Sequence, residues 1–197
     1  MSESGNFNDR RMLTSDTVGF GVQMTSRSRR SKQKSPVQLK MLPSACGRLL
    51  FDPKYCRTCR VCEQACAITH EGYARPTVSR INITFNEFAP SESAIQAQYC
   101  FQCQDAPCLI ACSNGAMTRE LATGAVTILE GKCTGCMRCR KACEWAIPKL
   151  HPERKVAIKC DLCCGRVEGP ACVQFCPLTG KALSYDPHYY HREGLHE

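Results

Sequence analysis

Short stretches in which apolar and polar residues alternate recur along the chain from residue 47 onward. A period of two is typical of β-strands that bury one face, and the glycine, proline and asparagine residues between the stretches predict turns. The predicted strands are GRLLF (47–51), SRINITF (79–85), AMTRE (116–120), AVTIL (125–129), KVAIK (155–159) and ALSY (182–185).

Between these strands, apolar residues lie three or four positions apart, which is typical of short helices. Examples are APCLIAC (106–112) and CMRCRKACEW (136–145), each long enough for one or two helical turns. The resulting order is strand, cysteine-containing loop, short helix and strand, and it occurs four times. The pattern therefore predicts an α+β fold built from small βαβ modules.

The first part of the chain, residues 1–45, shows no such periodicity and contains the run TSRSRRSKQKSP. It holds eight basic residues against three acidic ones, a net charge of +5. Such a composition is typical of a tail. We expect a basic, extended N-terminal tail over residues 1–45 that binds a partner, a folded domain over 46–186 and a C-terminal tail over 187–197. The alternative for the first segment is a solvated arm without a partner.

The apolar core of the folded domain is predicted to be small. Leucine, isoleucine, valine and phenylalanine together number 37 of 197 residues, whereas cysteine alone numbers 18. Sulfur can stabilise such a chain through disulfides or through bound metal. Disulfides need an oxidising compartment, but Asp16 interrupts the only apolar stretch near the N-terminus, and no apolar run is long enough to span a bilayer. We therefore expect a cytoplasmic, reducing location and no membrane span, which favours metal.

Sixteen of the cysteines fall into four groups of four, which is an internal repeat. Each group begins with C-x2-C and ends with C-x3-C, and only the gap between the two pairs varies. A structural zinc site usually takes its second cysteine pair from a dozen or more residues away, whereas this close spacing is typical of [4Fe-4S] ligation. The spacing therefore favours iron-sulfur clusters over zinc. The groups are Cys56, Cys59, Cys62 and Cys66; Cys100, Cys103, Cys108 and Cys112; Cys133, Cys136, Cys139 and Cys143; and Cys160, Cys163, Cys172 and Cys176.

These groups, with the insertion CDLCCGRVEGPACVQFCP (160–177) in the last one, resemble the four-cluster ferredoxin-type subunits of molybdenum and tungsten oxidoreductases. That family includes subunits of the dimethyl sulfoxide reductase class, of formate hydrogenlyase and of carbon monoxide dehydrogenase systems. The resemblance covers residues 47–186. It implies tandem, nested dicluster ferredoxin modules, in which the outer groups (46–80 with 155–186) pair with each other and the inner groups (95–150) do the same.

The resemblance also implies four ligand sets, each with three cysteines of one group and one of its paired group. The first set is Cys56, Cys59, Cys62 and Cys176; the second is Cys160, Cys163, Cys172 and Cys66; the third is Cys100, Cys103, Cys108 and Cys143; and the fourth is Cys133, Cys136, Cys139 and Cys112. Iron would be bound through these sixteen thiols alone.

A few polar residues near the groups have more than one interpretation. Cys46 and Cys164 lie outside the pattern; Cys164 could replace Cys163 as a ligand, but C-D-x-C matches the family, so we expect Cys164 to be a bystander thiol. His70 and Glu71 could transfer protons. Because no second acid or base lies at a recognisable distance from them in the sequence, we expect a polar loop beside a cluster instead.

Charges adjacent in sequence predict an order of reduction potentials. The third group is flanked by Lys132, Arg138, Arg140 and Lys141, whereas the second has Asp105 and no adjacent base. Positive charge stabilises the more negative reduced cluster. We therefore expect the third group's cluster to be reduced more easily than the second group's.

Together these features predict a non-catalytic electron-transfer subunit with four [4Fe-4S] clusters. No phosphate loop or nucleophile motif is present in the sequence. The net charge of +8 would be offset by four clusters that each carry about −2 with their thiolates, so it does not require nucleic acid as a partner. The alternatives are a free soluble polyferredoxin and, from another class, a zinc-binding nucleic-acid module.

One further stretch, THEGYARPTVSRINI (69–83), bears on the partner. It resembles iron-sulfur subunits that accompany tungsten enzymes of the aldehyde oxidoreductase family, including the ATP-independent class II benzoyl-coenzyme A reductase of strict anaerobes. This resemblance implies a large catalytic subunit with a tungsten or molybdenum pterin cofactor. It leaves room for a further redox subunit.

Overall fold

The structure, a computed structural model, describes residues 47–191 with the exception of position 92. All of these residues belong to one unit of the chain. The predicted N-terminal tail (1–45), Cys46 and the end of the predicted C-terminal tail (192–197) lie outside the described residues.

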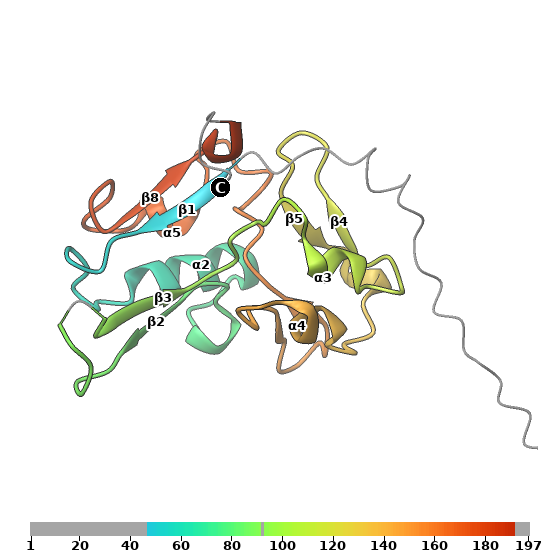
Figure 1. Cartoon of the computed structure of the whole chain (residues 1–197), viewed down its shortest axis with the longest axis horizontal. Coiled ribbons are helices and arrows are strands. Elements are labelled where there is room, and N and C mark those ends of the chain that lie inside the picture. The colour runs from blue at the N-terminus through green and yellow to red at the C-terminus, as the bar shows by residue number, and fades with distance from the viewer. Residues whose placement is uncertain (1–46, 92, 192–197) are drawn as a thin grey trace, which may run out of the picture. The chain divides into compact units, whose positions relative to one another are not determined.

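The described strands form four antiparallel sheets of two strands each. β1 (Arg48–Phe51) pairs with β8 (Leu183–Asp186), so the two ends of the described chain lie side by side (Figure 1). The other three sheets join strands that are neighbours in sequence: β2 (Asn82–Phe85) with β3 (Ile95–Gln98), β4 (Met117–Arg119) with β5 (Val126–Ile128), and β6 (Lys149–Leu150) with β7 (Ala157–Ile158).

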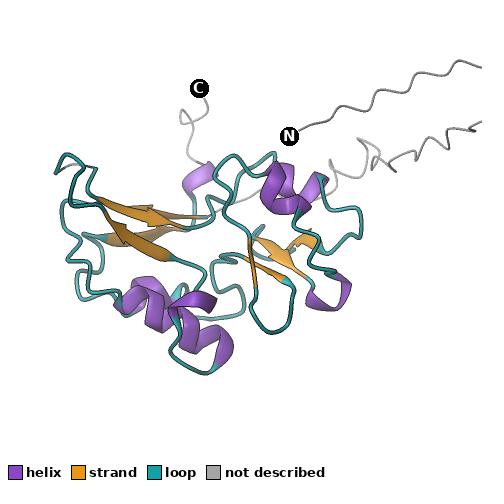
Figure 2. Cartoon of the chain, turned by 90° about the horizontal axis from the view of Figure 1, so that it is seen from below, coloured by secondary structure: helices purple, strands orange, loops and turns teal. Residues whose placement is uncertain are grey.

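Each described α-helix carries at least one cysteine. The longest, α2 (Val61–Glu71), ends at Gly72, which adopts a left-handed φ of 78° and donates its backbone N–H to the oxygen of Ile68. Among the described residues, no helix combines the length and apolarity needed to cross a membrane. Loops connect the short elements (Figure 2). The remaining helices are α3 (Pro107–Ile110), α4 (Arg138–Ala142) and α5 (Ala171–Gln174), and the 3-10 turns are η1 (Pro76–Val78), η2 (Glu130–Lys132) and η3 (Tyr189–His191).

This architecture confirms the α+β prediction at the level of short helices and short antiparallel strands. All six predicted strands are present, although SRINITF becomes a strand only at residue 82 and KVAIK only at 157–158. The sequence pattern does not predict β3 and β6. β3 alternates small or apolar residues with glutamine, which has no strong strand preference, and it forms because Ile95 and Ala97 pair with Phe85 and Ile83 of β2. β6 is only two residues long.

The buried core has two parts, and thiols belong to both. The small number of apolar side chains in each part agrees with the composition. The first part contains Leu49, Cys66, Ile81, Tyr99, Ala125, Cys160, Leu162, Cys172 and Leu183; the second contains Ala106, Cys108, Leu109, Met117, Val126, Cys139 and Ala157.

Two buried polar side chains connect these two parts. The amide of Gln102, which is 1% exposed, donates to the backbone oxygen of Cys160 at 2.9 Å and accepts from the backbone N–H of Val126 at 2.8 Å. The ammonium of Lys159 donates to the same Cys160 oxygen at 2.8 Å and to the oxygen of Val126. The same two side chains thus form hydrogen bonds with buried backbone groups of both parts. These bonds hold the two parts of the core together.

The turn of the third cysteine group depends on a glycine. Gly135 has a φ of +66°, and a Cβ atom there would collide with the backbone oxygen of Lys155. We expect Gly135→Ala to lower the free energy of unfolding by about 1–3 kcal/mol, because it adds backbone strain and a steric clash. Urea denaturation under anaerobic conditions measures this difference.

The matched control is Gly131→Ala, four residues earlier in the same segment. A Cβ atom at Gly131 would meet no atom within 4 Å. We expect its free energy of unfolding to stay within about 0.5 kcal/mol of the unmodified protein. Equal destabilisation by both substitutions would show that the close approach at Gly135 is not what constrains this loop.

Candidate metal centres

The four C-x2-C loops share one backbone feature. The residue before the second cysteine has a positive φ in each loop: 52° at Thr58, 54° at Gln102, 66° at Gly135 and 59° at Leu162. Three of these residues are not glycine, so the surrounding structure must hold them in a conformation that costs energy. In those three loops the backbone N–H of the same residue donates to the sulfur of the first cysteine at 3.5 Å. The backbone therefore wraps around the first thiol in the same manner each time.

The first set of thiols lines an apolar cavity of about 260 Å³. Cys56 and Cys59 come from the loop before α2, Cys62 from the first turn of α2, and Cys176 from the segment after α5. The lining contains no carboxylate. Burial, followed by the charge of Glu63, raises the pKa of Cys62 to about 12. A bound soft metal ion would be needed to convert this thiol into a thiolate at neutral pH.

Two further sets line smaller cavities. In each, three thiols of one inner group meet the last thiol of the other inner group, because α3 packs against α4. Burial raises the pKa of Cys108, on α3, to about 12. Cys100, Cys103, Cys108 and Cys143 line a cavity of about 90 Å³; Cys133, Cys136, Cys139 and Cys112 line one of about 20 Å³.

The remaining set lies in the first part of the core, where α2 packs against α5. Cys66 comes from α2 and Cys172 from α5, and Cys160 and Cys163 belong to the loop between β7 and α5. Burial raises the pKa of Cys172 well above its usual value, and negative charge on Cys160, Cys66 and Cys163 raises it further. Cys66, Cys160 and Cys172 belong to one buried cluster, and Cys163 lies beside His70 of α2.

Twelve of the sixteen predicted ligands line three cavities, four to each, and Cys66, Cys160 and Cys172 pack in one core cluster. The cavities of the first and fourth sets contain no carboxylate, whereas Asp105 and Glu144 line that of the third set and Asp161 lies beside Cys163 of the second. Sets of four thiols suit iron-sulfur clusters, and ligation itself stays a prediction.

Backbone N–H groups outside the C-x2-C loops also donate to sulfur, which favours the thiolate form. Cys66 accepts from Arg80 at 3.2 Å, Cys112 from Ala116 at 3.2 Å and Cys133 from Ala157 at 3.3 Å.

A polar network surrounds the second set. His70 places its Nε2 3.6 Å from the sulfur of Cys163 and 3.4 Å from Asp161 Oδ1. Asp161 also accepts from the backbone N–H of Cys163 at 3.0 Å and pairs with Arg80 at 2.5 Å. Burial lowers the pKa of His70. The imidazole is thus held against a candidate ligand thiol by the aspartate of the C-D-L-C motif.

Glu71 has a different environment from its neighbour His70. Its carboxylate accepts two hydrogen bonds from Arg154, at 2.5 and 3.0 Å, and lies 3.4 Å from His151 Nε2. Burial tends to raise the pKa of Glu71, but the hydrogen bonds and charge of Arg154 outweigh it, so this pKa is lowered. The carboxylate therefore fastens α2 to the loop around residue 154.

The second cysteine group is surrounded by more positive charge than its sequence neighbours suggest. Arg119, which is 6% exposed, donates to two backbone oxygens of that group's loop at 2.7 and 2.6 Å. Lys159 lines the same cavity as the thiols of the third set. Arg140, which the sequence assigns to the third group, instead donates to the oxygen of Pro148 at 3.0 Å. The premise behind the expected order of potentials is therefore wrong for the second group.

The sequence of the chain is similar to that of known iron-sulfur proteins. The family model described as "4Fe-4S dicluster domain" matches residues 91–185. The "Aliphatic sulfonate oxidoreductase, polyferredoxin-like subunit" of Pyrococcus furiosus is 36% identical over 132 residues, 67% of this chain and 72% of that protein. The "Putative electron transport protein YsaA" of Escherichia coli is 37% identical over 144 residues, 68% of this chain and 86% of that protein.

Two other matches complete the comparison. "Formate hydrogenlyase subunit 2" of Escherichia coli is 32% identical over 169 residues, 68% of this chain and 79% of that protein. A solved structure described as "Active site complex BamBC of Benzoyl Coenzyme A reductase in complex with Benzoyl-CoA" aligns with a TM-score of 0.41 and 22% identity over 71% of this chain and 78% of that chain. That structural similarity is too low to support an inference. On the sequence relationships alone, the chain belongs to the family of [4Fe-4S] ferredoxin-type electron-transport proteins and oxidoreductase subunits.

Proposed function

We propose that this chain holds four [4Fe-4S] clusters, one in each thiol set, in two nested dicluster modules. The observation that carries the proposal is the repeated C-x2-C loop, which has the same left-handed residue before its second cysteine four times. When bound, such a cluster accepts and releases one electron. The thiols hold it, the backbone N–H groups offset the negative charge on sulfur, and the apolar lining limits the access of water.

The exposure of the thiols suggests where electrons enter and leave. Among the described cysteines, Cys59 and Cys136 are exposed, and they belong to the first and fourth sets. The second and third sets contain no exposed thiol, and all four thiols of the second set are buried. We therefore infer that the first and fourth clusters face other proteins and that the second and third clusters lie between them.

The proposed partner is a large catalytic subunit with a tungsten or molybdenum pterin cofactor in the cytoplasm of an anaerobe. Relatives named as subunits of a sulfonate oxidoreductase and of formate hydrogenlyase support a place within an oxidoreductase complex. Tungsten and benzoyl-coenzyme A reduction are narrower hypotheses that rest on the resemblance of residues 69–83. Part of that stretch serves the second thiol set, since Arg80 donates to Cys66, so its sequence reflects more than the partner.

Removal of a single thiol tests whether each cluster takes its fourth ligand from the paired group, which we call the crossed sets. We expect Cys66→Ser to abolish the second cluster, proposed on Cys160, Cys163 and Cys172. The first cluster, which includes Cys62 of the same helix α2, should remain. Iron per chain should fall from about sixteen to about twelve, because each cluster holds four irons. Iron analysis and electron paramagnetic resonance of anaerobically purified protein measure both effects.

The control is Cys164→Ser, which removes a half-buried thiol that belongs to none of the sets. Its iron content and spectrum should match those of the unmodified protein. Loss of the first cluster in Cys66→Ser, with the second cluster intact, would contradict the crossed sets. Zinc in place of iron in the unmodified protein would contradict the proposed function as a whole.

A deletion tests the partner. Removal of residues 1–40, which lie outside the described residues, should leave the iron content and visible spectrum unchanged and weaken association with the large subunit. Because the segment is basic, added salt should weaken the binding of the full chain more than that of the truncated chain. Anaerobic co-purification with metal analysis of the large subunit measures the effect and distinguishes tungsten from molybdenum.

Two results would change this part of the proposal. If the truncated chain co-purifies fully with the large subunit, the docking surface lies on the folded domain. If the full chain retains its clusters and never co-purifies with a large subunit, a mobile polyferredoxin is the better description.

A further inference from the structure

Lys159 is a buried cation without a carboxylate partner among the described ion pairs. Its residue is 3% exposed, and its ammonium donates to the backbone oxygens of Val126 and Cys160. Two carbonyl dipoles satisfy hydrogen bonds but carry no net charge. A buried ammonium is costly unless a negative charge lies nearby. Asp105 and Glu144 line the third set's cavity with Lys159 but are exposed and form no ion pair with it, so an anion buried next to Lys159 would offset its charge.

The thiol sets provide candidates for that anion on two sides. Lys159 directly precedes Cys160 of the second set, and its side chain lines the cavity of the third set. Cys100 and Cys108 of the third set line this cavity with Lys159, and Cys100 also packs against the core cluster that contains Cys160. The second and third sets therefore approach each other here. Lys159 lies at this junction.

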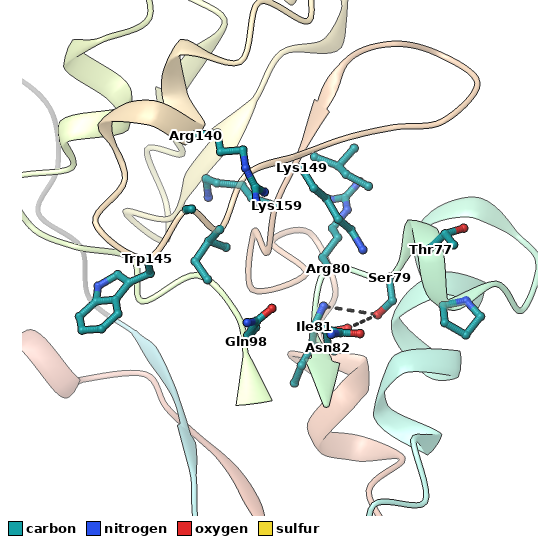
Figure 3. A pocket seen from close by; sticks show the side chains of 14 residues that line it. Thr77, Ser79, Arg80, Ile81, Asn82, Gln98, Arg140, Trp145, Lys149 and Lys159 are labelled. Atoms are coloured by element: carbon teal, nitrogen blue, oxygen red, sulfur yellow. Dashed lines mark hydrogen bonds between the residues drawn. The ribbon is translucent and has the colours of Figure 1, made fainter. Parts of the chain in front are cut away.

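Three other cations surround the neighbouring cavity of about 440 Å³, and Figure 3 shows Arg80, Arg140 and Lys149 on the same side of it as Lys159. Arg80 is neutralised by Asp161 at 2.5 Å, and Arg140 donates to a backbone oxygen. Lys149 is half-buried and lines this cavity but, unlike Lys159, does not line the cavity of the third set. It is therefore a matched control for Lys159.

We propose that Lys159 is a shared counter-charge for the two middle clusters, where it stabilises their reduced forms and so raises their reduction potentials. This inference rests on the proposed function, because it requires clusters in the second and third sets. Reduction adds one negative charge to a cluster, and a nearby cation lowers the free energy of the reduced state. Because Lys159 lies between the second and third thiol sets, its charge acts on both middle clusters. It therefore keeps their reduction potentials close to each other.

The test is redox titration of the anaerobically purified full chain, monitored by electron paramagnetic resonance. Lys159→Gln removes the charge and keeps an amide donor for the two backbone oxygens. We expect the ratio of reduced to oxidised form, at a fixed potential, to fall about tenfold for both middle clusters; a tenfold change is 59 mV for one electron. Lys149→Gln should leave this ratio unchanged for the third cluster, and Lys159→Arg should leave both ratios close to the unmodified protein. The signal missing in Cys66→Ser identifies the second cluster.

Unchanged potentials in Lys159→Gln would overturn the proposal. Loss of iron in both Lys159→Gln and Lys159→Arg would also overturn it, in favour of a purely structural lysine. Loss of iron in Lys159→Gln alone would support it, since these variants differ in the charge at this position. Absence of iron-sulfur signals from the unmodified chain would instead refute the proposed function, so the two failures are distinguishable.

Discussion

The convergence of thiols from distant segments is the constraint on which the fold depends. Cys66 of α2 meets Cys172 of α5 in the core, and the pairing of β1 with β8 holds the two segments that carry these helices together. In the inner part, the packing of α3 against α4 brings Cys108 close to Cys143. Each helix contact therefore also completes a thiol set. A chain with few large apolar side chains can afford such long-range contacts only if something other than hydrophobic burial stabilises them.

The thiols themselves indicate what that contribution is. Burial raises the pKa of Cys62 and Cys108 to about 12, so without metal these side chains are neutral thiols and contribute no more than small apolar groups. In the proposed holoprotein, metal-thiolate bonds replace the S–H groups, and their free energy adds to that of folding. Folding and cluster binding are then coupled. The buried bridge of Gln102 and Lys159 joins the two core parts by hydrogen bonds, so the two pairs of sets share these contacts.

The sequence predicted those features that depend on residue type and spacing alone, such as metal binding by cysteine and strand formation by alternating apolar residues. Cysteine spacing predicted iron-sulfur clusters, which the family supports, and alternation predicted six strands that the structure contains. The ligand sets that the resemblance implies stay a prediction. The left-handed loop residues could not be predicted, because Thr58, Gln102 and Leu162 lack the glycine that usually marks such a conformation. Their φ values follow from the packing of the loop around a thiol. β3 likewise depends on its partner strand rather than on its own composition.

Charges that are adjacent in sequence were a poor guide to the charges that surround each cysteine group in the structure. The basic run around the third group suggested a local field, yet Arg140 turns to a backbone oxygen, and the second group receives Arg119 and Lys159 from distant segments. These two cations are 6% and 3% exposed, so they cannot contact an extended polyanion such as nucleic acid. Part of the positive charge of the folded domain is therefore directed inward, toward the thiols. This placement is what a protein needs if its own negative charge is carried by buried cofactors, because each buried cation then offsets a charge that water cannot reach.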